Sequence, residues 1–209
     1  PDHISLPLGK PAISFSDAKQ GHFCAILTPG EGLCWGGNNQ GQFGDGTVCT
    51  GGDYFSDNNN PTPNGCNSKN GRYTPVIVDD SNFPTNSSFI SISTGFHHTC
   101  GIIDNNDLYC WGYNDNGQIG IGDIDYMNYP IPQFVDSNVI AVSTGNNHVC
   151  ALYESQTVKC WGANSEGQLG TGYMANEATP TAINLSSNIS VICTTRINQR
   201  PLISAQIFH

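Results

Sequence analysis

One 25-residue pattern occurs three times in this chain of 209 residues, and the repeat constrains the fold more than any other feature. The copies align without a gap at 22–46, 98–122 and 148–172. Each begins with His-x-Cys, has a second Cys ten residues after the first, continues with Trp-Gly and ends with Asn-x-x-Gly-Gln-x-Gly-x-Gly. The copies start 76 and then 50 residues apart, so the first interval contains an insertion, at about 48–73.

Four short strands fit into each period of about 50 residues. The apolar lead-ins at 89–95 and 139–145 alternate and are rich in β-branched residues, which predicts a strand. The two cysteine-bearing segments flank turn residues and predict a hairpin, and a proline-valine segment such as 74–78 precedes each lead-in. A unit of this size cannot bury its apolar face alone, so the units must stack as propeller blades.

The sequence therefore predicts an all-β fold of about three four-stranded blades plus a partial fourth, in an incomplete or open propeller. The excess of Gly and Pro, 24 and 12 residues, agrees with a chain poor in helix. We expect one domain over residues 1–209. Its expected parts are unit 1 at about 4–47, the insertion at 48–73, unit 2 at about 74–126, unit 3 at about 127–177 and an irregular partial unit at 178–209.

Eight of the nine cysteines have a predicted partner. The two cysteines of each hairpin lie roughly opposite each other on antiparallel strands, within reach of a disulfide. The insertion holds one further pair. Cys193 is left over; it is free, bonded to another molecule, or paired outside this chain. The predicted bridges are Cys24–Cys34, Cys100–Cys110, Cys150–Cys160 and Cys49–Cys66.

The repeat resembles that of the regulator of chromosome condensation (RCC1) family of β-propellers, over about residues 1–193. The third copy carries the resemblance best, in Gly145, His148, Cys150, Cys160, Trp161, Gly162, Asn164, Gly167, Gln168, Leu169, Gly170 and Gly172. The paired cysteines resemble the secreted branch of such repeats. Three features depart from the family: Lys19 replaces the glycine found at 95 and 145, the His and Cys expected near 197 and 199 are missing, and seven blades usually close the ring.

Several repeated residues are candidate site residues, and we interpret them as structural. Metal ligands have to converge, whereas equivalent residues of different blades are expected to lie apart, so a structural role is favoured over a metal site for the histidines. Acidic turns at 104–107, 115–117 and 122–125 fit turn chemistry, with bound calcium as the alternative. The residues assigned to the repeat structure are His22, His98, His148, Trp35, Trp111, Trp161, Gly41, Gly117 and Gly167.

Charge and motifs exclude several functions. The formal net charge is −10 with only 7 Lys and Arg, which argues against nucleic-acid binding. No apolar run reaches the roughly 18 residues of a membrane span, and no catalytic motif is present, so we expect neither membrane insertion nor an enzyme. The cysteine content and the acceptor sites at Asn86, Asn184 and Asn188 favour a secreted, glycosylated protein without a cofactor.

We expect an extracellular structural or adhesive protein that acts through protein–protein contacts. A shortage of blades would leave strand edges and an apolar end face uncovered, so copies of the chain are the expected partners, in an oligomer or filament. The alternative is a soluble binder or inhibitor that clamps a partner enzyme with tyrosine-rich loops. A nucleotide-exchange factor for a small GTPase rests on family analogy alone. The tyrosine-rich loops contain Tyr54-Phe55, Tyr113, Tyr126, Tyr129 and Tyr173.

Overall fold

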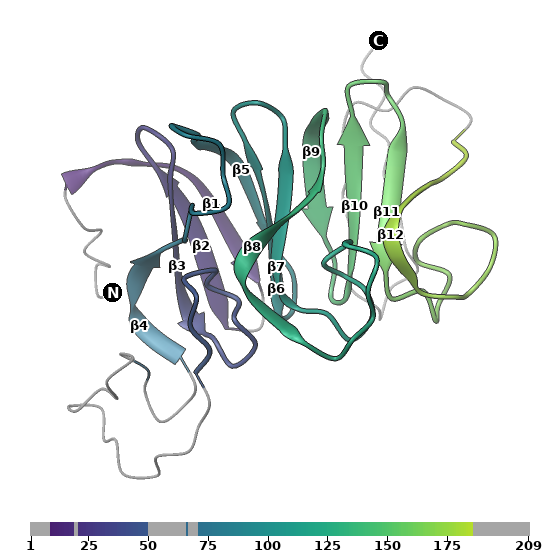
Figure 1. Ribbon diagram of the computed structural model, residues 1–209, viewed down its shortest axis with the longest axis horizontal. Helices are drawn as coiled ribbons and strands as arrows, with labels where there is room; N and C mark the ends of the chain where they lie inside the picture. The colour runs from purple at the N-terminus through teal and green to yellow at the C-terminus, as the bar shows by residue number, and fades with distance from the viewer. Residues whose placement is uncertain (1–8, 19–20, 50–65, 67–70, 186–209) are drawn as a thin grey trace.

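The computed structural model describes residues 9–18, 21–49, 66 and 71–185. This part of the chain contains twelve strands in three four-stranded antiparallel sheets and no α-helix, which confirms the predicted all-β blades (Figure 1). The strands are β1 (Ala12–Ala18), β2 (His22–Leu27), β3 (Glu31–Gly37), β4 (Gly71–Ile77), β5 (Phe89–Thr94), β6 (His98–Ile103), β7 (Leu108–Tyr113), β8 (Asn128–Asp136), β9 (Val139–Thr144), β10 (His148–Tyr153), β11 (Val158–Gly162) and β12 (Glu177–Ala182).

Each sheet is a simple meander of consecutive strands. The orders are β1-β2-β3-β4, β5-β6-β7-β8 and β9-β10-β11-β12, and we call these sheets blades 1, 2 and 3. The blades stand side by side in a row that runs from the N-terminal to the C-terminal end (Figure 1). In the described residues the row does not close on itself.

The predicted unit boundaries are wrong as blade boundaries. The segment at 71–77, which contains the proline-valine stretch, pairs with β3 as the outer strand of blade 1 instead of opening unit 2. The same holds for β8 and β12, which pair with β7 and β11. The reason is that the loop after the Trp-bearing strand turns the chain back along that strand. The insertion at 48–73 therefore lies inside blade 1, and most of it falls outside the described residues.

The second strand of each sheet is buried along its whole length in blades 2 and 3. All six residues of β6 and all six of β10 are buried, because neighbouring elements cover both faces of the sheet. This explains why the sequences of these strands, HTCGII and HVCALY, show no alternation of polar and apolar residues. The lead-in strands β5 and β9 alternate more, with exposed residues such as Ile90 and Ile140.

The hydrophobic core lies between the blades. One cluster joins Ile26 and Phe43 of blade 1 to Phe89 and Trp111 of blade 2. A second cluster joins blade 2 to blade 3 in the same way, with Trp161 at its centre. The contacts between blades therefore hold the fold together, as expected of units that cannot bury their faces alone.

Four disulfides occur in the structure, and they join the cysteine pairs named from the sequence. The hairpin pairs are directly opposite in register, and each has its Cα atoms 4.1 Å apart. A bridge that closes a loop of this size contributes about 3 kcal/mol in the chain-entropy picture. Cys49 and Cys66 form the fourth bridge, with Cα atoms 5.6 Å apart. Cys193 lies outside the described residues.

Candidate functional site

Neighbouring blades are joined by a contact that occurs twice with the same geometry, and we call it the blade contact. The indole Nε1 of Trp111 donates to the backbone oxygen of Gln42 at 2.9 Å. The indole Nε1 of Trp161 donates to the backbone oxygen of Gln118 at 3.1 Å. Both indoles are fully buried, so each N–H needs an acceptor. The loop that follows the Trp-bearing strand, at 38–46, 114–122 and 164–172, contains this glutamine, and we call it the Gln loop. The Trp of one repeat and the Gln loop of the preceding repeat are thus the two halves of one interface.

The asparagine that opens the Gln loop gives this loop its shape. In blade 2, Asn114 Oδ1 accepts from the backbone N–H of Ile119 at 3.0 Å. The chain then passes so close to the next indole that a Cβ on Gly120 would lie 2.6 Å from Nε1 of Trp161. Real Cβ atoms do not approach so closely, so this position needs glycine, which also adopts the positive φ of 85° found there.

The three glycines assigned to the repeat structure differ in what they face. A Cβ on Gly41 would lie 2.8 Å from Cα of Pro130, and one on Gly117 would lie 2.7 Å from Cα of Ala178. Both glycines therefore lie against the outer strand of the next blade. A Cβ on Gly167 would meet no described atom within 4 Å.

At the first end of the row, blade 1 presents the Trp half of the blade contact. Trp35 has no hydrogen-bond acceptor among the described residues. Its ring stacks on Phe23, with centroids 5.9 Å apart, and Phe23 stacks on Phe15 at 6.0 Å. Phe15 is 60% exposed. The register positions equivalent to Phe23 are Thr99 and Val149, which are buried, so this aromatic face corresponds to a face that is covered in the other blades.

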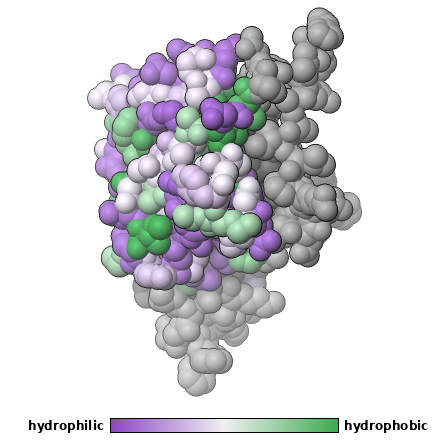
Figure 2. Space-filling model, turned by 90° about the vertical axis from the view of Figure 1, so that its right-hand side faces the viewer, coloured by the Kyte–Doolittle hydropathy of each residue, from purple (hydrophilic) through white to green (hydrophobic). Residues whose placement is uncertain are grey.

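At the other end of the row, blade 3 presents the Gln half. Asn164 Oδ1 accepts from the backbone N–H of Leu169 at 3.0 Å, so the loop has the same shape as in blades 1 and 2. A Cβ on Gly170, the equivalent of Gly120, would meet no described atom within 4 Å. Seen from this side, hydrophobic surface lies in separate patches among hydrophilic residues (Figure 2). The sequence motif identifies Gln42 and Gln118 as repeated residues but does not show that their backbone oxygens accept from the indoles.

The repeated histidines are buried and neutral. Nε2 of His22 lies 3.0 Å from Oγ1 of Thr99 in blade 2, which is a bond between blades. The rings of His98 and His148 lie where a Cβ on Gly95 and Gly145 would be, which explains the glycine three residues before each histidine. Burial lowers the pKa of His22 and of His98 to about 3, helped by other histidines nearby, and that of His148 to about 4. Among the described residues no group of three ligands could hold a metal ion.

The acidic turns proposed as calcium alternatives use their side chains in local hydrogen bonds. Asn105 Oδ1 accepts from the backbone N–H of Asp107, and Asp125 accepts from Asn114 Nδ2, from the backbone N–H of Met127 and from the hydroxyl of Tyr129. The hydrogen bond that Asp125 accepts from the hydroxyl of Tyr129 is the main cause that holds the pKa of this carboxyl below its usual value. Asx-type bonds of this kind are ordinary turn chemistry.

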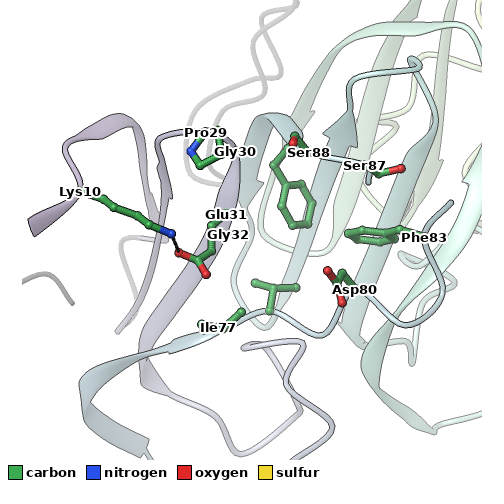
Figure 3. Close-up of a pocket in the computed structure, with 12 residues that line it drawn as sticks. Lys10, Pro29, Gly30, Glu31, Gly32, Ile77, Asp80, Phe83, Ser87 and Ser88 are labelled. Atoms are coloured by element: carbon green, nitrogen blue, oxygen red, sulfur yellow. Dashed lines mark hydrogen bonds and ion pairs between the residues drawn. The ribbon is translucent and has the colours of Figure 1, made fainter. Parts of the chain in front are cut away.

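A small cavity of about 250 Å³ lies between the β2–β3 turn of blade 1 and the connection that leads to β5 (Figure 3). Lys10 and Glu31 form an ion pair of 3.0 Å on one side, and Asp80 and Phe83 lie on the other. The described lining contains no pairing of a nucleophile with a base. This arrangement therefore gives no support to catalysis.

The two predicted glycosylation sites within the described residues lie on the surface. Asn86, in the connection before β5, and Asn184, after β12, are both exposed. Asn188 lies outside the described residues. A search of the described residues for a helix long and apolar enough to cross a membrane finds none.

Three solved or curated proteins illustrate what the chain is similar to. The ultraviolet-B receptor UVR8 of Arabidopsis thaliana is 37% identical over 109 residues, which are 52% of this chain and 19% of the receptor. Human WBSCR16 has a TM-score of 0.70 at 14% identity, over 91% of this chain and 44% of that one. Prp20p from Saccharomyces cerevisiae has a TM-score of 0.67 at 19% identity, over 87% of this chain and 41% of that one. The chain thus spans less than half of each of these proteins.

The sheets and the blade contact define a set of β-propeller blades. Two models of the regulator of chromosome condensation (RCC1) repeat match the sequence, one at 105–152 and 158–194, the other at 89–118 and 139–168. Together they cover 89–194, about half of the chain. The chain therefore belongs to the RCC1 repeat family.

Proposed function

We propose that this chain is an extracellular protein-interaction module of structural or adhesive type, and that its partners are further copies of itself. One observation carries the proposal: the two ends of the blade row present complementary halves of the blade contact, Trp35 at one end and the Gln168 loop at the other. A head-to-tail junction would place the indole N–H of Trp35 on the backbone oxygen of Gln168 in the next copy.

The chemistry of such a junction already exists twice inside the chain. Trp111 and Trp161 lose their contact with water by docking on the preceding Gln loop, and the hydrogen bond satisfies the buried N–H. The stacked Phe15 and Phe23 would add apolar area at the Trp35 end. Because the two faces differ, the contact is heterologous, and it produces a ring if the rotation closes and a filament if it does not.

Four disulfides support an extracellular location, because such bonds persist in oxidising compartments and are rare in the cytosol. The exposed acceptor site at Asn86 agrees with this location. The protein would act by binding, without catalysis and without a cofactor.

A second candidate function is a soluble binder that clamps a partner enzyme. Two exposed tyrosines favour it: Tyr126 in the connection between β7 and β8, and Tyr173 in the connection between β11 and β12. The solved relative Prp20p is described by its binding to Gsp1p and histones, so protein binding is known in this fold. No observation on this chain favours nucleotide exchange over simple binding.

The test is a mixing experiment with two end variants, each measured by sedimentation velocity over a concentration series. Phe15→Ser damages the Trp35 end, and Gly170→Ala places a methyl group where the indole of the next copy would dock. We expect the unchanged chain to assemble as its concentration rises, and each variant alone to associate at least about tenfold more weakly. Mixed together, the two variants should form a dimer and nothing larger, because only one intact pair of ends remains.

The matched control is Ile90→Ala, which removes a side chain that is 51% exposed on β5 of blade 2, the middle blade of the row. It should assemble as the unchanged chain does. An unchanged chain that stays monomeric at all concentrations, or variants that assemble normally, would refute self-assembly through the ends.

A further inference from the structure

A patch of exposed apolar side chains lies on two loops at one end of the sheets of blades 2 and 3. Its members follow the Gln loops of blades 2 and 3, between β7 and β8 and between β11 and β12. These two connections lie at the same end of their sheets (Figure 1). The loop patch consists of Ile124, Tyr126, Met127, Tyr173 and Met174, all exposed.

The two halves of the loop patch are tied to each other. Asn176 Nδ2 donates to Asn116 Oδ1 at 3.2 Å, and the backbone N–H of Gly122 donates to the oxygen of Ala178 at 2.8 Å. Both bonds join the blade 2 loop to the segment around the start of β12. The two connections that carry the loop patch are therefore joined across the neighbouring blades.

Hydrogen bonds inside the loops leave the apolar side chains facing outward. In blade 3, Asn164 Nδ2 donates to the backbone oxygens of Tyr173 and Ala175, at 2.6 and 2.9 Å. In blade 2, Asp125 accepts from the backbone N–H of Met127 at 3.2 Å. Backbone groups are thus satisfied within the loops, and the side chains of Met127 and Met174 gain little burial in return.

Tyr126 is the most exposed of the five, at 77%, and its backbone is strained. Its φ of 55° lies in the left-handed region, which a bulky residue rarely adopts. Burial does not compensate for this strain, because the ring lies mostly in water. A strained and exposed aromatic residue is typical of a site that presents a side chain to a partner.

The charge around the loop patch selects the partner. Its loops carry Asp115, Asp123, Asp125 and Glu177, and three of these carboxylates accept hydrogen bonds from tyrosines. A tyrosine hydroxyl orients a carboxylate but does not neutralise its charge. The cations of the described residues lie elsewhere: Arg72 pairs with Asp45 and Lys159 with Asp136, while Lys10 pairs with Glu31.

We propose that the loop patch is the docking site for a segment of a partner protein that combines apolar side chains with Lys or Arg. Tyr126 would be the central anchor, and the two methionines would adapt their shape to the apolar side chains of the segment. The carboxylates would attract its basic residues and set its orientation. All five residues of the loop patch belong to one copy of the chain, so the site does not require self-assembly, although Tyr173 and Met174 adjoin the Gln168 loop at the end of the row.

The test is a selection from a displayed library of random 12-residue peptides against the full chain with its disulfides intact. Selected peptides should contain apolar residues together with Lys or Arg, and their affinity should fall as salt rises. Tyr126→Gly keeps the positive φ and removes the ring, so it should weaken the binding of the selected peptides at least about tenfold. Asp123→Asn should weaken it several-fold, with a smaller dependence on salt.

Tyr73→Ala serves as the control here, because it removes a tyrosine ring that is 63% exposed on β4, outside the loop patch. It should leave the affinity unchanged. Binding that survives in Tyr126→Gly, selected peptides rich in Asp and Glu, or no selected peptide at all would each overturn the proposal.

Discussion

Mild acid should destabilise this protein well before its carboxylates titrate, because three buried histidines cannot accept protons in the folded state. Burial lowers the pKa of His22 and His98 to about 3 and that of His148 to about 4, against about 6.5 in an unfolded chain. Between these values the unfolded state binds more protons than the folded state. Stability is therefore fully present above pH 6.5 and is lost as the pH falls.

The size of this effect follows from proton linkage. Lowering the pH from 7 to 5.5 costs about 1.3 kcal/mol for each of the three histidines, or about 4 kcal/mol in all. His97 is half-buried and its pKa is also lowered, so any contribution from it has the same sign. A loss of this size is a large fraction of the stability of an ordinary domain.

Urea unfolding of the oxidised chain at pH 7, 6.5, 6 and 5.5 measures this loss directly. His148→Gln removes one of the three titrating groups, so the loss between pH 7 and 5.5 should fall by about a third, whatever the substitution costs at pH 7. A free energy of unfolding that stays constant down to pH 5.5 would refute the reasoning. So would equal slopes for the variant and the unchanged chain.

Three further predictions concern stability, all measured by chemical or thermal unfolding. Gly120→Ala and Gly170→Ala should share a backbone cost of about 1–2 kcal/mol, and only Gly120→Ala should lose about 2 kcal/mol more, because its Cβ would meet Trp161; equal losses would show that the blade contact yields easily. Replacing Cys100 and Cys110 together by Ala should cost about 3 kcal/mol, and a loss near zero would contradict a structural role for the bridge. Tyr126→Gly should leave stability unchanged or raise it by up to about 1 kcal/mol; a clear loss would show that the ring is structural.

The blades could be predicted from the sequence because the repeat is local. The ten-residue spacing of Cys100 and Cys110 places them opposite each other in a hairpin, and the strand pairing agrees. The phase of the repeat could not be predicted in the same way. A periodic sequence has no intrinsic starting point, so nothing in 71–77 indicates that it pairs with the strand before it and not with the strand after it.

The candidate surfaces were only partly visible in the sequence. The sequence predicts that Tyr126 lies in a loop, but its left-handed backbone depends on how Asp125 and Asn114 close that loop. The role of Gln42 and Gln118 lies in a backbone oxygen, which every residue has, so no side-chain pattern could identify it. The exposed face at Phe15 has the alternation of any half-buried strand, and only the comparison with blades 2 and 3 shows that its counterparts are covered.

The bridge between Cys49 and Cys66 has a consequence for protein engineering. It fixes two chain points whose Cα atoms are 5.6 Å apart, on a blade whose remaining strands are held by their own ladders. The cost of closing a longer loop rises only slowly with its length. A foreign hairpin or epitope could therefore replace the residues between these two cysteines, displayed from a fixed base without rebuilding the sheet beneath it.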